Sequence, residues 1–161
     1  PAGETPAKTE GYEGFFHLLG FSGNVETTTM DYIIRDHSSK KFQARKKAME
    51  DAVTVINSRY GQGTAELDMA DQYYNMLEKV KPQMHIVDTA LAAMRDLGIE
   101  PKVIPVRGGT DGSQLSYRGL PTPNLFTGGH NAHGKHEFIS VLSMEKAVDL
   151  ILKIVELYGG K

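Results

Sequence analysis

Three stretches in the first half of the chain carry apolar patterns that favour extended structure. Residues 12–21, YEGFFHLLGF, are apolar and aromatic between glycines, and they predict a strand. Residues 30–37, MDYIIRDH, predict a second strand, because apolar side chains recur on one face. Residues 64–70, TAELDMA, alternate apolar and charged positions and predict a half-buried third strand.

Between the second and third strands, apolar residues recur every three or four positions, which is the period of a helix. Residues 36–61 therefore predict an amphipathic helix that Asp36, Ser38 or Ser39 can cap and Gly61 can end. Its apolar positions are Phe42, Met49, Ala52, Val53 and Ile56. Residues 11–76 are thus expected to form a small antiparallel sheet backed by a helix.

The pattern changes near QYYNMLEKVKP, residues 72–82, where a domain boundary is expected. Beyond it, the spacing predicts an α/β arrangement in which helices at 82–99 and 143–160 enclose two strands and several loops. The expected strands are residues 101–106 and 121–129, and residues 113–119 form a short helix or turn. Ser143 is expected to cap the last helix and Gly159 to end it.

Composition excludes several classes of function. The formal net charge is -2, so the chain lacks the basic surface expected of a nucleic-acid-binding protein. No apolar run approaches the ~20 residues that span a bilayer, and no signal-peptide pattern opens the sequence. Because there are no cysteines, thiolate zinc sites and cysteine nucleophiles are excluded, and a reducing cytoplasm is the expected compartment.

Residues 127–140, TGGHNAHGKHEFIS, hold three of the six histidines. His130, His133 and His136 are spaced three apart and interrupted by glycines, so a loop is expected. Loops at the ends of strands in α/β sheets commonly bind ligands. The loop could therefore supply one or more metal ligands, or its histidines could simply be solvated. Residue types alone leave both interpretations open.

Residues 107–112, RGGTDG, predict a tight turn whose backbone N–H groups suit a carboxylate or phosphate. The stretch is neither a G-x-G-x-x-G motif nor a Walker loop, so a nucleotide site is not indicated. Asp111 could instead cap the short helix that follows, and Arg107 could bind a substrate carboxylate or a neighbouring acid. Arg35 has the planar fork that binds carboxylates, or it could extend into solvent at a strand end.

Several longer strings, taken together, indicate a family. They are TEGYEGFFHL, YIIRD, YYNMLEKV, VRGGTDGSQLSYRGLPTPNLFTGG and HGKHEF. From about residue 10 to 158 the chain resembles the C-terminal portion of the peptidase T family. These are tripeptide aminopeptidases of the co-catalytic zinc aminoacylase/carboxypeptidase superfamily.

The resemblance implies an α/β fold of two parts. One is the C-terminal part of a zinc-peptidase α/β catalytic domain, expected over residues 77–161. The other is most of an inserted α+β lid that also forms the homodimer, expected over residues 11–76, with residues 1–10 as a connection. The chain would then begin inside the lid.

The resemblance also implies roles for individual residues. His133, followed four residues later by Glu137, corresponds to the last zinc ligand, whereas His130 and His136 are neighbours without an implied role. Arg35 corresponds to the arginine that binds the C-terminal carboxylate of a tripeptide substrate. Three residues of the GGTDG turn are implied substrate contacts, namely Gly109, Thr110 and Asp111.

In this family two zinc ions share a bridging aspartate, and a glutamate is the general base. The H-x-D motif, that aspartate and the base all lie upstream of the region that the chain resembles. One imidazole cannot hold a zinc ion that needs about four ligands, so the segment alone is expected to be inactive. The alternative is a dimerisation or scaffold module without catalysis or metal binding of its own.

Overall fold

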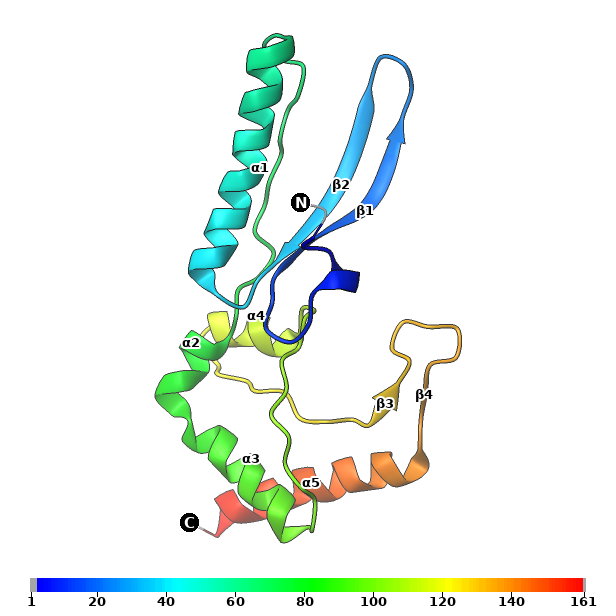
Figure 1. The fold of residues 1–161 in the computed structure, drawn as a ribbon. Helices are drawn as coiled ribbons and strands as arrows, with labels where there is room; N and C mark the ends of the chain where they lie inside the picture. Colours follow the sequence, from blue (N-terminus) through cyan, green and yellow to red (C-terminus); the bar gives the residue numbers. More distant parts are fainter. Residues whose placement is uncertain (1–2, 161) are drawn as a thin grey trace. The chain divides into compact units, whose positions relative to one another are not determined.

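A computed structural model of the chain describes residues 3–160 (Figure 1). The chain divides into two compact units. The first comprises the residues up to Asn75 together with Ile104–Gly109, a segment that returns to it later in the sequence. The second comprises Met76–Val103 and the residues from Thr110 onward.

The first unit contains a long β-hairpin (Figure 1). Strands β1 (Phe15–Gly23) and β2 (Thr28–Arg35) pair antiparallel, with Phe15 opposite Arg35. The register shifts between Leu18 and Gly20, which marks an irregularity in β1. Both predicted strands are therefore confirmed, and the pairing fixes Arg35 beside the buried start of β1.

Helix α1 (Ser39–Tyr60) confirms the predicted first helix. Among the three candidate caps, the side chain of Ser38 accepts the hydrogen bond from the backbone N–H of Lys41. Gly61 ends the helix with a φ of 106°, a conformation that glycine adopts without steric cost.

The predicted third strand at 64–70 is wrong, because this segment forms no ladder. It runs back beside α1 (Figure 1), held by the side chain of Asn57. The Asn57 amide nitrogen donates to the carbonyl of Ala65 at 2.9 Å, and its oxygen accepts from the Ala65 N–H at 2.8 Å. The Asn57 amide thus satisfies both backbone groups of Ala65, as a neighbouring strand would at that residue.

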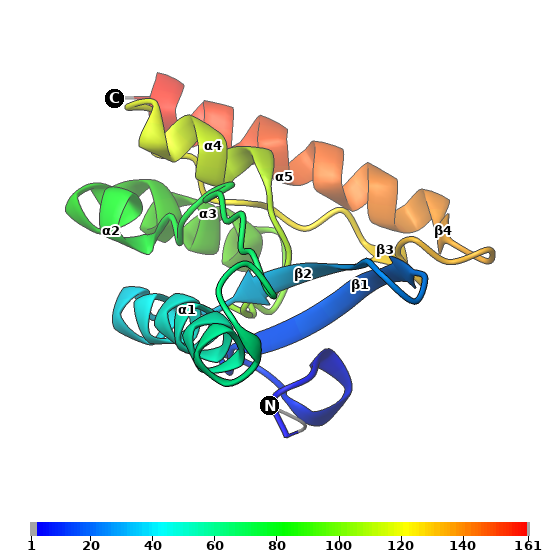
Figure 2. The ribbon, with the colours of Figure 1, turned by 90° about the horizontal axis from the view of Figure 1, so that it is seen from above.

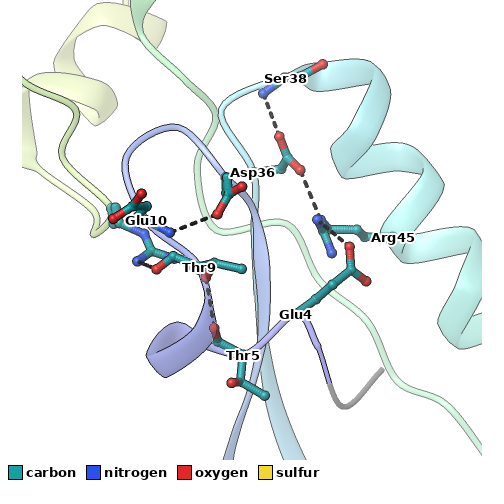
Figure 3. Close-up of polar contacts among 9 residues, drawn as sticks. Glu4, Thr5, Thr9, Glu10, Asp36, Ser38 and Arg45 are labelled. Carbon is teal, nitrogen blue, oxygen red and sulfur yellow. Dashed lines mark hydrogen bonds and ion pairs between the residues drawn. The ribbon is translucent and has the colours of Figure 1, made fainter.

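An ion-pair cluster around the buried carboxylate of Asp36 joins the end of the hairpin, α1 and the N-terminal segment (Figure 3). The Nε of Arg45 donates to Asp36 at 2.9 Å, and its Nη2 lies 3.0 Å from Glu4. The Asp36 side chain is only 1% exposed and also accepts the backbone N–H of Ser38. Burial lowers the pKa of Arg45, but its bonds to Asp36 and Glu4 outweigh this and raise the pKa overall.

The second unit is mainly helical. Its elements are α2 (Leu77–Val80), a 3-10 turn (Lys81–Gln83), α3 (His85–Asp96), α4 (Asp111–Tyr117), β3 (Gly129–His130), β4 (Phe138–Ile139) and α5 (Val141–Gly159). Helices α3 and α5 pack together (Figures 1 and 2), and Ala93 and Leu150 are fully buried between their apolar faces. Both long helices predicted for this half are confirmed.

Two predicted strands of this region are wrong. Residues 101–106 form no strand, and of 121–129 only Gly129 enters the short β3–β4 ladder. A run of apolar residues becomes a strand only when a neighbour satisfies its backbone N–H and C=O groups. No such neighbour pairs with these segments within residues 3–160.

Two predicted helix caps are wrong, because each helix is capped by a residue earlier in the sequence. Ser140 rather than Ser143 caps α5, and its hydroxyl accepts from the Ser143 N–H at 3.1 Å. Thr110 rather than Asp111 caps α4, so Asp111 is the first helical residue. Across residues 3–160, none of the helices combines the length and apolar character needed to cross a bilayer.

Candidate functional site

Arg35, at the end of β2, is held by neutral groups. Its Nη1 donates to the carbonyl of Ile34 at 3.2 Å, and its Nη2 donates to Oε1 of Gln72 at 3.0 Å. The guanidinium carbon lies 4.7 Å from the ring centroid of Tyr73. Among the described residues Arg35 forms no ion pair. Within residues 3–160, its positive charge is therefore not balanced by an adjacent carboxylate.

Gly109, a predicted substrate contact, lies against the same tyrosine. A Cβ atom at this position would come within 2.5 Å of a ring carbon of Tyr73 and within 2.9 Å of its hydroxyl oxygen. Contacts this short do not occur in folded proteins, so a residue with a Cβ atom at this position would have to displace the ring. The first unit thus brings together Arg35 and Gly109, which are far apart in sequence, through a residue that the sequence patterns did not indicate.

Arg107 binds neutral groups of the N-terminal segment, and no acid of the described residues pairs with it. Its guanidinium donates to the carbonyl oxygen of Thr9 at 2.6 Å and to the Thr9 hydroxyl, and it lies 4.7 Å from the ring centroid of Phe15. Arg107 therefore ties the N-terminal segment to the returning segment Ile104–Gly109. The expectation of a neighbouring acid is wrong.

Thr110 and Asp111 belong to the second unit, at the start of α4. The Thr110 hydroxyl accepts from the Ser113 N–H and from the side-chain amide of Asn124, both at 3.3 Å. Asp111 is exposed. Thr110 thus has a structural role as a helix cap, whereas the carboxylate of Asp111 is accessible.

The histidine loop is the tip of a short hairpin. His130 in β3 faces Phe138 in β4, and their rings stack with centroids 4.9 Å apart. At the tip, Asn131 and His133 have φ angles of 55° and 64°, in the left-handed region that residues with a side chain seldom adopt. His130 therefore stabilises the base of the loop, and the strained residues lie at its end.

Two side chains of the loop stabilise this conformation. The backbone N–H of His133 donates to Oε2 of Glu137 at 3.2 Å, and the side-chain amide of Asn131 donates to the carbonyl of His136 at 3.2 Å. The imidazole of His133 itself is exposed. The loop thus presents the His133 ring outward, on a backbone that Glu137 holds.

The side chains that could bind a metal do not gather into a zinc site among the described residues. No group of three or more His, Cys, Asp or Glu side chains that could hold a metal occurs within residues 3–160. A zinc ion bound by this chain would have His133 as a single protein ligand, whereas zinc sites use about four. The residues present therefore do not make up a zinc site by themselves.

The residues that hold Arg35 lie in a stretch anchored at both ends. Lys46 in α1 forms an ion pair with Asp71 at 2.8 Å, and Tyr74 donates a hydrogen bond to the same carboxylate at 2.7 Å. The pKa of Asp71 is lowered, most strongly by the hydrogen bond from Lys46 and next by the hydrogen bond from Tyr74. Gln72 and Tyr73 lie between these two anchors.

Sequence reasoning assigned no function to Gln72 and Tyr73. Both lie in residues 72–82, where the change of pattern predicted a domain boundary. Gln72 is 37 residues after Arg35 in the sequence. No local period links residues at that separation. The only available signal was a pair of adjacent tyrosines within a polar connection, which is too common to identify a site.

Comparison with known proteins places the chain in a family. The model of peptidase family M20/M25/M40 matches residues 6–157. Peptidase T of Clostridium novyi is 63% identical over 159 residues, which are 99% of this chain and 39% of that protein. Peptidase T of Caldanaerobacter subterraneus is 60% identical over 161 residues, again 39% of its length. The chain thus spans about two fifths of these curated relatives.

Solved structures agree with the fold. A tripeptidase from Staphylococcus aureus matches with a TM-score of 0.68 and 21% identity, over 96% of this chain and 42% of that one. Aminopeptidase PepT from Bacillus cereus matches with a TM-score of 0.64 and 23% identity, over 92% of this chain and 40% of that one. The predicted mixed α/β fold, covering part of a peptidase, is confirmed. The chain belongs to peptidase family M20/M25/M40.

Proposed function

We propose that this chain is the C-terminal segment of a tripeptide aminopeptidase, which hydrolyses the N-terminal peptide bond of tripeptides at a two-zinc centre. The similarity to two peptidase T sequences over at least 99% of the chain supports the enzyme class. The unbalanced charge of Arg35 is the observation within the chain that carries the substrate assignment.

Arg35 binds the C-terminal carboxylate of the substrate in this proposal. Arginine has five N–H donors, and the two hydrogen bonds to Ile34 and Gln72 leave the others free for a carboxylate. Since no acid of the described residues pairs with the guanidinium, a bound carboxylate gains the full charge-assisted interaction. A fixed distance from the reacting bond to this carboxylate would favour tripeptides over longer peptides.

His133 supplies one zinc ligand in this proposal, and the remaining ligands and the general base come from a longer chain. The exposed imidazole at the tip of a hairpin suits a ligand contributed to an ion held mainly by other residues. Family members are generally metal-dependent, and zinc supplies a bound water with a pKa near 7 and polarises the carbonyl. The segment alone is therefore inactive.

The remaining assignments follow the same division. Gly109, Thr110 and Asp111 line the backbone of the substrate, and residues 11–76 and 77–161 belong to the lid and to the catalytic domain. A homodimer forms through the lid, where Leu19 and Phe21 of the hairpin are 58% and 69% exposed. The cysteine-free composition suits a reducing cytoplasm, where we assign the enzyme.

The proposal is tested with Arg35→Ala in the full-length enzyme. Rates are measured with a tripeptide and with the same peptide amidated at its C-terminus. Loss of a charge-assisted pair should lower kcat/KM for the free acid by about 10- to 100-fold. The amide should be affected little. Arg59→Ala, at the exposed end of α1, is the matched control, and equal losses on both substrates would refute the assignment.

A further inference from the structure

Tyr73 makes two contacts that concern the proposed carboxylate site. Its ring centroid lies 4.7 Å from the guanidinium carbon of Arg35, and Gly109 approaches the ring so closely that a Cβ atom there would force the ring to move. The Tyr73 hydroxyl is buried and has no hydrogen-bond partner in the described part of the chain. The ring, rather than the hydroxyl, therefore makes the contacts of this side chain.

The groups around Arg35 fix its position without neutralising it. Ile34 and Gln72 each bind one terminal nitrogen, and the aromatic ring packs on the guanidinium. An aspartate or glutamate in place of Tyr73 would compete with a substrate carboxylate for the same donors. An aromatic ring attracts the cation through its quadrupole and leaves the N–H donors free.

Arg45 provides the contrast within the same unit. It also contacts an aromatic ring, that of Phe16 at 5.2 Å, but two carboxylates, Asp36 and Glu4, bind its nitrogens. That arrangement is suited to a structural ion pair. The environment of Arg35 differs by the absence of any such acid within residues 3–160.

We infer that Tyr73 is a positioning residue that orients Arg35 for the substrate carboxylate. Gly109 is required because a larger residue would displace the ring. This inference rests on the proposed function of Arg35. Holding the guanidinium in its binding conformation before the substrate arrives reduces the conformational entropy lost on binding. Removing the ring should therefore weaken recognition of the carboxylate and leave the reacting bond unaffected.

The experiment uses the full-length enzyme with Tyr73→Leu, Tyr73→Phe, Arg35→Ala and the double variant Arg35→Ala/Tyr73→Leu. Each is assayed with a tripeptide and its C-terminal amide. Tyr73→Leu should lower kcat/KM for the free acid by about 3- to 30-fold, mainly through KM, because a guanidinium–ring contact contributes energy of that order. The amide should change by less than about twofold.

Three further readouts separate positioning from a general structural effect. Tyr73→Phe keeps the ring and should restore the wild-type preference for the free acid. The double variant should be no worse than Arg35→Ala, because a residue acting through Arg35 has no effect without it. Tyr60→Leu, at an exposed tyrosine of α1, is the control and should change neither rate.

The outcomes distinguish the two hypotheses. If Arg35→Ala is selective for the free acid while Tyr73→Leu harms both substrates equally, the positioning role is refuted and the proposed function stands. Losses that add in the double variant would also refute it, as would a loss in Tyr73→Phe as large as in Tyr73→Leu. If Arg35→Ala is not selective, both the proposed function and this inference fail.

Discussion

Individual residues in this chain show how one residue type serves different purposes. Arg45 is a buried structural cation because Asp36 and Glu4 pair with it. Arg107 fastens the N-terminal segment through Thr9. Arg35 and Arg107 both combine two neutral hydrogen-bond acceptors with an aromatic ring. They differ in that the unpartnered Nε of Arg107 is buried, whereas we propose that the remaining donors of Arg35 bind a ligand. The partners, and not the residue type, decide the role.

The Arg45 cluster should be essential for the stability of the first unit. In Arg45→Met the nearly buried carboxylate of Asp36 would lose its counter-charge, and breaking a buried pair in this way costs about 3–5 kcal/mol. Denaturant unfolding of the full-length enzyme measures the change. Arg59→Met, at the exposed end of the same helix, should change stability by less than about 0.5 kcal/mol; equal effects would contradict the account.

A similar argument applies at the tip of the histidine loop. His133→Ala in the full-length enzyme should lower turnover by at least about 100-fold and weaken the binding of one zinc ion, because it removes a proposed direct ligand. Bound zinc is measured by elemental analysis alongside activity. His136→Ala is the matched control, since it keeps the backbone carbonyl that accepts the hydrogen bond from Asn131. Full activity in His133→Ala would disprove the ligand assignment.

At the scale of elements, the stretch after α1 has a defined function in the fold although it is neither helix nor strand. Asn57 holds its beginning at Ala65, and Lys46 holds its end at Asp71. Between Asp71 and Tyr74 lie the two residues that contact Arg35. The ion pair between Lys46 of α1 and Asp71 therefore supports the proposed carboxylate site indirectly, because it anchors the segment that contacts Arg35.

This anchor should depend on pH. Since the bonds from Lys46 and Tyr74 lower the pKa of Asp71, the folded state favours the ionised carboxylate. The resulting stabilisation is complete above the ordinary value of 3.8 and is lost as the pH falls below it. Wild type should have a higher Tm than Asp71→Asn at about pH 7, and the difference should shrink as the pH falls below 3.8.

Asp51→Asn is the control for that experiment, because its partner Lys47 lies on the same helix and anchors no other segment. A Tm difference between wild type and Asp71→Asn that stays constant from neutral to acidic pH would contradict the role of the ionised carboxylate. Calorimetry of the full-length enzyme provides the Tm values.

At the scale of the whole molecule, the most informative feature is exposed apolar surface. Val103 and Ile104 are 72% and 71% exposed, and Leu142 and Val155 of α5 are 62% and 63% exposed. Apolar surface of this extent is typical of regions that contact further protein. The chain spans about two fifths of its curated relatives, so we expect the remainder of a longer enzyme to cover these residues.

The small number of proposed ligands also predicts that the isolated chain binds zinc weakly. A 161-residue protein with one proposed ligand should bind zinc more weakly than about 1 µM, because a stable site needs about four ligands. Calorimetric titration measures the affinity, and circular dichroism verifies that the helices are formed. The full-length enzyme is the positive control, and sub-micromolar binding by the isolated chain would show that further ligands lie within it.

Sequence alone predicted the elements whose hydrogen bonds are local or lie between consecutive segments. Helices α1, α3 and α5 followed from apolar periodicity, and the β1–β2 hairpin followed from two strands separated by a turn. The family was predicted from long strings, and the comparisons confirmed it. Helix caps were less accurate, because neighbouring serines such as Ser140 and Ser143 are chemically equivalent candidates.

Only the tertiary structure decided which apolar segments become strands and which residues surround Arg35. Residues 64–70 and 101–106 have strand-like patterns, yet a ladder needs a partner to satisfy backbone groups, and their own side chains cannot supply one. Likewise, the contact between Arg35 and Tyr73 joins residues with no shared period. Local patterns encode local hydrogen bonds, whereas contacts between distant residues depend on how the folded chain brings them together.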